Sequence, residues 1–208
     1  MGAISEKTVD RLIQYRRNLL TVEKQHMGQI FSHQIAKMSG VTAAQVRRDL
    51  MAIGYSGSPV RGYHFNALLE SLGDFIDAKT KQGVALVGVG QVGRALLHYF
   101  QGRRPKLSIE ALFDVDESKV NRVFHGCHSY PLARLPEIVK EKNIRVGIIT
   151  VPAEVAQEVT NVMVQADIRG ILNYAPVKLN VPPNVFVENR DMTLAVEKIA
   201  YLARQSLK

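Results

Sequence analysis

The chain reads Gly83-Val-Ala-Leu-Val-Gly88-Val-Gly90-Gln-Val-Gly93-Arg-Ala-Leu-Leu97 where an apolar run typical of a strand meets a pattern typical of a helix. The three glycines of this G-x-G-x-x-G turn have separate physical roles. Gly88 permits a tight turn, Gly90 lets a bound group approach the backbone, and Gly93 lets the helix pack closely on the strand. The first turn of a helix also presents unpaired N–H groups, which favour phosphate. The stretch therefore predicts a strand–turn–helix unit that binds phosphate groups.

A carboxylate follows the glycine turn at the sequence spacing that is typical of dinucleotide-binding sites. A second apolar run, Ile109 to Phe113, ends at Asp114, which lies 21 residues after Gly93. A carboxylate at the end of the second strand accepts hydrogen bonds from the adenine ribose and repels a 2′-phosphate. We therefore expect NADH or NAD+ as the ligand. Two alternatives stay open: a glycine-rich turn without a ligand, and a turn that binds coenzyme A.

Strands and helices alternate through this half of the chain. The sequence predicts helices at 91–100 and 153–166, and strands at 83–88, 107–113, 144–151, 168–172 and 185–187. Such alternation is typical of the doubly wound parallel sheet of the Rossmann fold. A last helix, Met192 to Ser206, follows Asp191 as its expected cap.

The first 80 residues have a different pattern, made of short helices. Apolar spacing predicts helices at 6–20, 33–39, 42–53 and 67–79. The turn-rich segment from Gly54 to Gly62 leads into a short strand at 63–65, so we expect a winged helix–turn–helix. The expected fold class is α/β, with a winged helix–turn–helix domain and its connecting helix at 1–80, a Rossmann domain at 81–190 and a C-terminal helix at 191–208.

Charge and cysteine content narrow the class of protein. The 208 residues carry a formal net charge of +8, and residues 1–65 hold nine Lys and Arg against four Asp and Glu. This N-terminal excess is the electrostatic footprint of a nucleic-acid partner. Cys127 is the only cysteine, which excludes an intrachain disulfide and fits a reducing compartment. With neither a signal peptide nor an apolar run of membrane-spanning length, we expect a cytoplasmic protein.

The predicted second helix of the helix–turn–helix carries side chains suited to reading DNA. In this motif the start of that helix enters the major groove. Gln reads adenine, Arg reads guanine, and small Ala residues allow close approach to the bases. The outward positions are Ala43, Ala44, Gln45, Arg47, Arg48 and Met51, with Lys37 and Arg61 as candidates for phosphate or minor-groove contact. The alternative is a set of solvated charges on an ordinary three-helix bundle.

With both halves described, the chain resembles the Rex family of redox-sensing transcriptional repressors over nearly its whole length. The matching segments are Arg11–Tyr15, Gln45–Leu50, the glycine turn, Phe113–Asp116, Thr150–Ala153 with Ala156 and Gln157, and Gly170–Pro176. The resemblance implies a homodimer that binds palindromic operator DNA when NADH is scarce and releases it when NADH binds. It also implies that the cofactor is a regulatory ligand and that the protein is not an enzyme.

The resemblance assigns roles to individual residues. Around the cofactor it implies Gly88, Val89, Gly90, Gln91, Val92 and Gly93 at the pyrophosphate, Asp114 at the adenine ribose, and Thr150, Val151, Pro152, Tyr174, Ala175 and Pro176 near the nicotinamide. It implies that the helix after Asp191 exchanges between subunits. Arg17, Tyr99 and Asp191 are expected to form polar contacts that differ between the two states.

Two positions depart from the family pattern. The family usually has a basic residue soon after the second glycine of the wing, whereas this chain has Pro59 there and Arg61 two residues later. Arg48 stands where lysine is commoner. The DNA contacts of the wing and the operator sequence are therefore the features that the resemblance predicts least well for this chain.

Redox discrimination has a simple electrostatic origin. Oxidised nicotinamide is a cation and the reduced ring is neutral, and burying an unpaired charge is costly. A pocket of Val151, Pro152, Ala153 and Ala175 without a nearby carboxylate would therefore prefer NADH.

Other chemistry-bearing residues fit enzymes poorly. One alternative, an NAD-dependent oxidoreductase, would need a substrate pocket and a base, but we expect no separate substrate domain in this sequence. Tyr174 and Lys178 match a Tyr-x-x-x-Lys pair, but Pro176 between them disfavours the helix that the pair requires. The segment His125–His128 has too few ligands for structural zinc, so no metal is expected. A repressor that senses another nucleotide, such as coenzyme A, stays as a second alternative.

Overall fold

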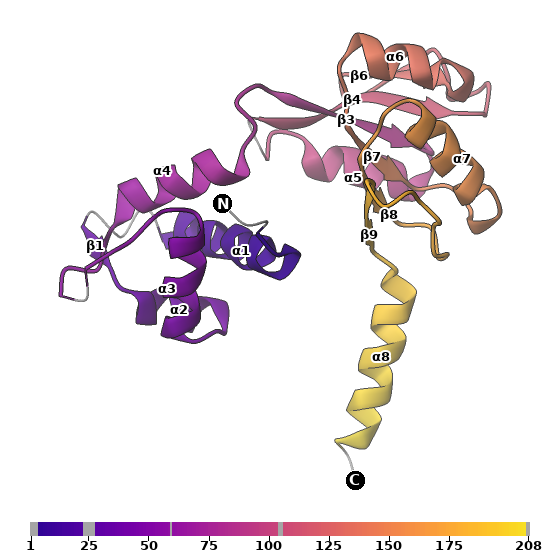
Figure 1. Ribbon diagram of the computed structural model, residues 1–208. Helices are drawn as coiled ribbons and strands as arrows, with labels where there is room; N and C mark the ends of the chain where they lie inside the picture. The colour runs from indigo at the N-terminus through magenta and orange to yellow at the C-terminus, as the bar shows by residue number, and fades with distance from the viewer. Residues whose placement is uncertain (1–3, 23–27, 59, 104–105, 207–208) are drawn as a thin grey trace. The chain divides into compact units, whose positions relative to one another are not determined.

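The computed structural model describes residues 4–22, 28–58, 60–103 and 106–206. The chain divides into two compact units, Met1–Lys79 and Thr80–Lys208. Each is described by itself below, as unit 1 and unit 2 (Figure 1).

Unit 1 is a helical domain with one two-stranded ribbon. Its elements are α1 (Glu6–Val22), β1 (Gln29–Ile30), α2 (Ser32–Ser39), α3 (Ala43–Ala52), β2 (Tyr63–His64) and α4 (Phe65–Ile76). The four helices lie within a few residues of the predicted ranges. The expected strand at 63–65 is shorter by one residue, because Phe65 is buried as the first residue of α4.

The turn between α2 and α3 has the geometry of a helix–turn–helix. Gly40 ends α2 at φ 65°, in the left-handed region that favours glycine. Thr42 then caps α3 by accepting a hydrogen bond from the Gln45 N–H at 3.1 Å. Val46 and Leu50 of α3 are fully buried and join a core formed with α1, α2 and α4. This packing leaves the opposite side of α3 facing outward.

A wing follows α3. Ser58 and Gly62 exchange two backbone hydrogen bonds, of 3.0 and 2.7 Å, which close the tip of the loop. The strand after the tip pairs antiparallel with β1, with Ile30 opposite Tyr63. A Cβ at Gly62 would lie 2.6 Å from the carbonyl oxygen of Ile30 in a backbone of φ 68°, so this position requires glycine. Pro59 lies outside the described residues.

Unit 2 is built on a seven-stranded sheet of order β5-β6-β4-β3-β7-β8-β9. All neighbouring strands are parallel except the β5–β6 pair. The strands are β3 (Gln82–Val87), β4 (Leu107–Asp114), β5 (Val123–Phe124), β6 (Cys127–Pro131), β7 (Val146–Ile149), β8 (Gly170–Asn173) and β9 (Phe186–Asn189). After β3 the chain adds β4, β5 and β6 on one side of β3, and then crosses to the other side of β3 to add β7, β8 and β9. This reversal is the switch point at which doubly wound sheets bind ligands.

Helices cover both faces of this sheet (Figure 1). The covering helices are α5 (Gln91–Phe100), α6 (Leu135–Glu141) and α7 (Ala153–Gln165), with a 3-10 turn at Leu132–Arg134, whereas α8 (Met192–Gln205) extends away from the sheet. One apolar cluster joins the sheet to α6 and α7, and a second joins it to α5. The strands β5 and β6 and the helix α6 have no counterpart among the predicted elements.

Helix α8 has an apolar face that unit 2 does not cover. None of the residues of α8, all of which the structure describes, is buried. Its exposed large apolar side chains are Met192, Leu194, Val196, Ile199, Tyr201 and Leu202. Asp191 caps the helix as predicted, by accepting a hydrogen bond from the Leu194 N–H at 3.0 Å. Among the described residues, no helix is long and apolar enough to cross a membrane.

Candidate functional site

The glycine turn between β3 and α5 is held from the neighbouring strand. Gly88 has φ 100°, and a Cβ there would lie 2.8 Å from the carbonyl oxygen of Thr150. The Thr150 hydroxyl donates to the carbonyl oxygens of Gly88 at 2.7 Å and Val87 at 3.0 Å. A Cβ at Gly93 would overlap the Gly88 carbonyl oxygen, whereas a Cβ at Gly90 meets nothing within 4 Å. Two glycines thus permit close packing, and the third leaves space beside the backbone.

A cavity of about 660 Å³ opens above this turn, at the carboxyl ends of the parallel strands. It is lined by Val87, Gly88, Gly90, Val92, Asp114, Val115, Asp116, Lys119, Leu132, Thr150, Val151, Pro152, Val155, Glu158, Val159, Tyr174 and Pro176. Most of these side chains are apolar; three of the four charged groups lie at or just after the end of β4, and the fourth, Glu158, lies on α7. An elongated ligand with apolar rings and polar joints fits such a lining.

The structure brings together most of the predicted cofactor residues. Nine of the thirteen line the cavity: Gly88, Gly90, Val92, Asp114, Thr150, Val151, Pro152, Tyr174 and Pro176. Val89 and Ala175 are buried behind the wall, and Gly93 is buried in the contact between helix and strand. Gln91 is the first residue of α5 and is exposed. These four residues shape the turn and the wall from outside the lining.

The first turn of α5 faces the cavity without a cap. Gly90 occupies the N-cap position, and among the described residues no side chain accepts a hydrogen bond from the N–H groups of this turn. Uncapped N–H groups and the helix dipole favour an anion at this point. Together with the open space beside Gly90, they fit the pyrophosphate of a dinucleotide.

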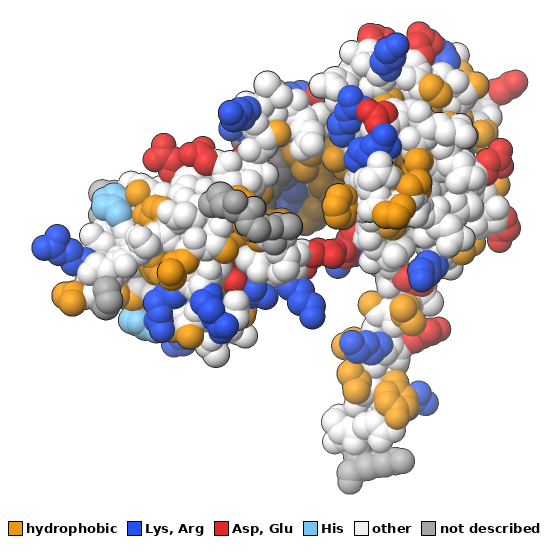
Figure 2. All heavy atoms as spheres, in the orientation of Figure 1, with side chains coloured by type: hydrophobic (Ala, Val, Ile, Leu, Met, Phe, Trp, Pro, Cys, Tyr) orange, Lys and Arg blue, Asp and Glu red, His pale blue; other side chains and the backbone are white. Residues whose placement is uncertain are grey.

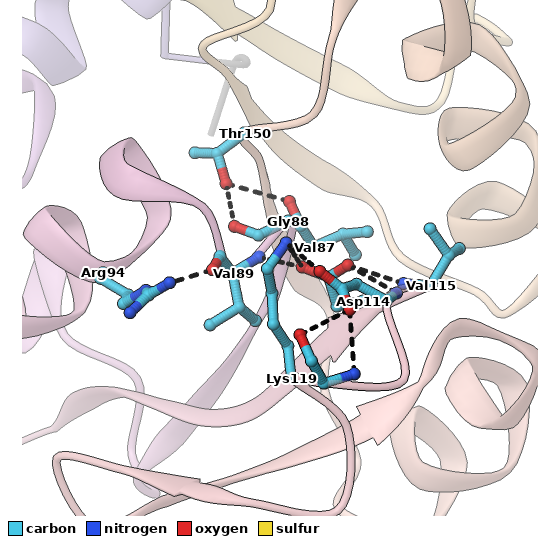
Figure 3. A network of polar contacts seen from close by, with 10 residues as sticks. Val87, Gly88, Val89, Arg94, Asp114, Val115, Lys119 and Thr150 are labelled. Atoms are coloured by element: carbon cyan, nitrogen blue, oxygen red, sulfur yellow. Dashed lines mark hydrogen bonds and ion pairs between the residues drawn. The ribbon is translucent and has the colours of Figure 1, made fainter.

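Asp114, at the end of β4, ties the glycine turn to the sheet (Figure 3). Its Oδ2 accepts a hydrogen bond of 2.7 Å from the Val89 N–H, inside the G-x-G turn. Its Oδ1 accepts from the Val115 N–H at 2.8 Å and from the Asp116 N–H at 3.0 Å. The carboxylate is only 8 % exposed, and three backbone donors fix its orientation.

Lys119 lies over the remaining side of this carboxylate. Its Nζ is 3.7 Å from Asp114 Oδ2 and 3.0 Å from Asp116 Oδ2. Hydrogen bonds from the Ser118 side chain and from Lys119 lower the pKa of Asp116 to about 2. The Asp116 carboxylate in turn raises the pKa of Lys119. Lys119 and Asp116 were not among the predicted residues, although two carboxylates and a lysine in the first six residues after a strand were a usable signal.

The segment after β8 forms another part of the cavity wall, and Asn173 fixes it. The Asn173 Nδ2 donates to the carbonyl oxygens of Ala175 at 3.2 Å and Val177 at 2.9 Å, and its Oδ1 accepts from the Ala175 N–H at 3.0 Å. The same Nδ2 donates to the Asn189 Oδ1 of β9 at 2.9 Å. One buried amide therefore links the wall segment to the strand that leads into α8.

The apolar pocket predicted at the nicotinamide end is present only in part, through Val151 and Pro152, which line the cavity. Ala153 and Ala175 do not line it, whereas the carboxylates of Asp114, Asp116 and Glu158 do. Glu158 comes from α7, one turn after Val155, and helical spacing puts both on the cavity side. Any preference for a neutral ring must therefore come from the local surroundings of that ring.

The DNA-contact candidates of unit 1 gather on the outward side of α2 and α3. Figure 2 shows Lys and Arg side chains grouped over these helices. Ala44, Arg47, Arg48 and Met51 are exposed along α3, and Ala43 and Gln45 are half-buried. Lys37 on α2 and Arg61 in the wing are exposed as well. Arg47 donates to the Ser32 hydroxyl at 3.0 Å, so its position depends on α2.

Gln45 is held by a buried network rather than projecting freely. Its Nε2 donates to Asp49 Oδ1 at 2.8 Å. Asp49 also accepts two hydrogen bonds of 2.7 Å from Arg11 and one of 2.8 Å from the Tyr15 hydroxyl. Burial alone would raise the pKa of Asp49, but the hydrogen bonds from Arg11, Tyr15 and Gln45 outweigh it and lower that pKa. Burial and the bond to Asp49 raise the pKa of Tyr15.

The three predicted switch residues lie in different settings. Arg17 is exposed on α1 of unit 1. Tyr99 of unit 2 is half exposed, and the Arg103 guanidinium carbon lies 4.0 Å from its ring centre. Asp191 is the cap of α8. That these residues form polar contacts that differ between the two states stays a prediction.

The residues that suggested enzyme or metal chemistry have other roles. Tyr174 to Lys178 form a loop after β8, so the Tyr-x-x-x-Lys pair does not share a helix face. Within the described ranges there is no group of three or more His, Cys, Asp or Glu side chains arranged to hold a metal ion. Cys127 is buried on β6, and burial raises the pKa of its thiol to about 11.

A helix–turn–helix unit followed by a nucleotide-type sheet defines the class of ligand-responsive transcription regulators. Similar sequences identify the family within this class. It is 36% identical to the redox-sensing transcriptional repressor Rex of Natranaerobius thermophilus, over 99% of this chain and 94% of the relative. It is also 36% identical to Rex of Carboxydothermus hydrogenoformans, over 97% of each chain. The chain belongs to the Rex family of redox-sensing transcriptional repressors.

Family models and solved structures agree with both halves of the fold. Residues 3–50 match a family described as putative DNA-binding protein N-terminus, and residues 79–177 match a family described as CoA binding domain. Crystal structures of RSP, a Rex-family repressor, superpose over 99% of this chain. The complex with β-NAD+ and operator DNA gives a TM-score of 0.90 at 24% identity, and the complex with β-NADH gives 0.85 at 23%.

Proposed function

We propose that the protein is a cytoplasmic DNA-binding repressor that senses the balance of NADH and NAD+. It binds palindromic operator DNA as a homodimer and releases the DNA when NADH binds. The observation that carries this proposal is the cavity of unit 2, whose open glycine turn and uncapped helix fit a dinucleotide, in a chain whose relatives are redox-sensing repressors. The cofactor is a regulatory ligand here and is not consumed.

Each part of the chain has a role in this proposal. Residues 1–80 bind DNA, residues 81–190 bind the dinucleotide, and residues 191–208 hold the dimer together. The glycine turn from Gly88 to Gly93 and the start of α5 hold the pyrophosphate, and Asp114 stands where the adenine ribose would lie. The nicotinamide end is formed by Thr150, Val151, Pro152, Tyr174, Ala175 and Pro176.

Redox preference follows from the apolar side chains at the nicotinamide end. Val151, Pro152 and Pro176 offer no charge to pair with a cationic ring, and burying an unpaired cation is costly. These side chains therefore favour the neutral reduced ring. Two of the three carboxylates that line the cavity, Asp114 and Asp116, lie at or just after the end of β4, where the adenosine is assigned, and the third, Glu158, lies on α7. The preference for the reduced ring therefore requires that Glu158 does not pair with the ring.

DNA reading rests on the exposed side of α3 and on the wing. Arg47 and Arg48 are placed to contact guanine or phosphate, Ala43 and Ala44 allow the helix to approach the bases, and Lys37 and Arg61 contact the backbone. Gln45 can read adenine only in the orientation that Asp49 imposes. Two such units reach half-sites about 34–36 Å apart, so a change in their spacing breaks simultaneous binding.

The dimer is assigned to α8. Its row of exposed apolar side chains indicates a partner, because large contiguous apolar patches are rare on the surface of a monomer. We infer that α8 exchanges between subunits and packs on the partner. Arg17, Tyr99 and Asp191 then supply polar contacts that differ between the DNA-bound and NADH-bound states.

The decisive experiment is fluorescence anisotropy of the full chain on a palindromic duplex, chosen by enrichment from a random library. Adding NADH should raise the dissociation constant for DNA by about tenfold or more, within the usual range of allosteric coupling, and NAD+ should change it less than about twofold. Arg48→Ala should weaken DNA binding, whereas Arg122→Ala, an exposed arginine of unit 2, should not. Equal effects of NADH and NAD+ would refute redox sensing.

A second candidate is a repressor that senses coenzyme A, and the match of residues 79–177 to a CoA binding domain family favours it. The same assay separates the two. Coenzyme A should leave the anisotropy unchanged if the proposal is correct, and release of DNA by coenzyme A alone would establish the alternative.

A further inference from the structure

The acceptor positions of Asp114 are almost fully used by the protein itself. A carboxylate offers about four lone-pair positions, two on each oxygen. The backbone N–H groups of Val115 and Asp116 occupy both positions of Oδ1, and the Val89 N–H occupies one position of Oδ2. One acceptor position remains on Oδ2, and the Lys119 Nζ lies 3.7 Å from that oxygen (Figure 3).

Lys119 presents donors to the same cavity. Its side chain is 28% exposed and lines the cavity beside Asp114 and Asp116. An ammonium has three N–H donors: Asp116, at 3.0 Å, engages one of them, whereas Asp114, at 3.7 Å, is an ion-pair partner beyond hydrogen-bond distance. Among the described residues no other carboxylate lies within ion-pair distance of this ammonium, so N–H donors remain for a ligand at the end of β4.

We propose that Lys119 contacts the adenosine ribose and sets ligand specificity at that end of the cavity, while Asp114 is mainly a positioning residue that holds the glycine turn. The proposal rests on the proposed function, since it names a further contact for the same ligand. Lys119 donates a hydrogen bond to a ribose hydroxyl, and Asp116 keeps the ammonium in place. Asp114 supports the ligand through Val89 and the turn that meets the pyrophosphate.

The charge balance of this cluster determines how the site treats a 2′-phosphate. Asp114, Asp116 and Lys119 together carry one net negative charge, so the site disfavours a 2′-phosphate only moderately. Without Lys119 the cluster carries two negative charges beside the ribose. Loss of the ammonium should therefore weaken the binding of NADPH more than that of NADH.

The test is calorimetric titration of the full chain with NADH, NADPH and reduced nicotinamide mononucleotide, which lacks the adenosine. Lys119→Met should weaken NADH binding about tenfold, as expected for loss of one hydrogen bond from a charged donor, and NADPH binding by at least about tenfold more. Binding of the mononucleotide should be unchanged. Lys119→Arg should restore most of the NADH affinity, because it keeps a cationic donor.

Two control variants make the result specific. Lys106→Met removes the same charge at the opposite end of β4, where Lys106 is exposed outside the cavity, and should leave all three ligands unaffected. Asp114→Asn should weaken the mononucleotide as well as NADH, because the glycine turn loses its anchor. A Lys119→Met chain that binds NADH as the unmodified chain does, or that loses the mononucleotide equally, would overturn this inference alone. Failure of the unmodified chain to bind NADH would overturn the proposed function with it.

Discussion

Replacing Asp49 with alanine should destabilise unit 1 far more than its single charge suggests. The change removes four hydrogen bonds of 2.7–2.8 Å at once, two from Arg11, one from Tyr15 and one from Gln45. Tyr15 is fully buried, so its hydroxyl loses its partner without gaining water. The Arg11 side chain is 27% exposed and recovers some hydration. The cost should thus lie at the lower end of the range for breaking a buried ion pair, about 3 kcal/mol.

Thermal unfolding followed by circular dichroism measures this cost. For a domain of this size about 3 kcal/mol corresponds to a fall in the midpoint of roughly 12–24 °C. Asp10→Ala is the matched control, since it removes an exposed carboxylate from α1 and should shift the midpoint little. A fall of less than about 4 °C for Asp49→Ala, equivalent to about 1 kcal/mol, would refute the reasoning.

The pH dependence of stability gives an independent check on the same network. The folded pKa of Asp49 lies below its ordinary value of 3.8, so the folded state prefers the ionised carboxylate. The stability it contributes is therefore present above about pH 4 and is lost as the pH falls through the folded pKa. Asp49→Asn keeps the shape of the side chain but should lack this acid-sensitive part of the unfolding free energy. Identical acid sensitivity in both proteins would contradict the assignment.

Three further predictions concern unit 2. Gly93→Ala should abolish NADH binding in a titration, because its Cβ overlaps the Gly88 carbonyl oxygen; unchanged affinity would show that the turn has another shape. Cys127 should react with a disulfide reagent at pH 8 on the order of a hundredfold slower in the folded chain than in urea, since burial raises the pKa of the thiol to about 11 and only the thiolate attacks. Val196→Glu combined with Ile199→Glu should turn the dimer into a monomer in sedimentation, because charges replace the apolar row of α8; a dimer that persists would assign the interface elsewhere.

The sequence predicted the elements with a strong apolar pattern. The strand before Gly88 is an unbroken apolar run that is buried from Gly83 to Val87, and the helices α1, α3 and α7 carry apolar residues at helical spacing. By contrast, β6 reads Cys127-His-Ser-Tyr-Pro131, with only Cys127 and Ser129 buried, and its polar residues resemble a loop. Helix α6 has only seven residues and contains proline in its first turn, so its pattern is too short to identify.

The site was predictable where it depends on local backbone geometry. The glycine turn and Asp114 follow a spacing that the backbone requires, whereas the role of Gln45 depends on Asp49 and on Arg11, which lies 38 positions before Asp49. The role of Lys119 is equally hard to predict from the sequence, because its contact with Asp114 forms only when the loop after β4 folds back. Contacts of side chains across separate elements leave no periodic trace in a sequence.

The amide of Asn173 has a mechanical consequence for how a signal leaves the cavity. It bonds the backbone of Ala175 and Val177, beside the lining residues Tyr174 and Pro176, and it also bonds Asn189, two residues before the cap of α8. The cavity wall after β8 and the end of β9 are therefore held by the same side-chain amide. A ligand that displaces this wall segment must either move the N-terminus of α8 as well or break the hydrogen bonds of the Asn173 amide.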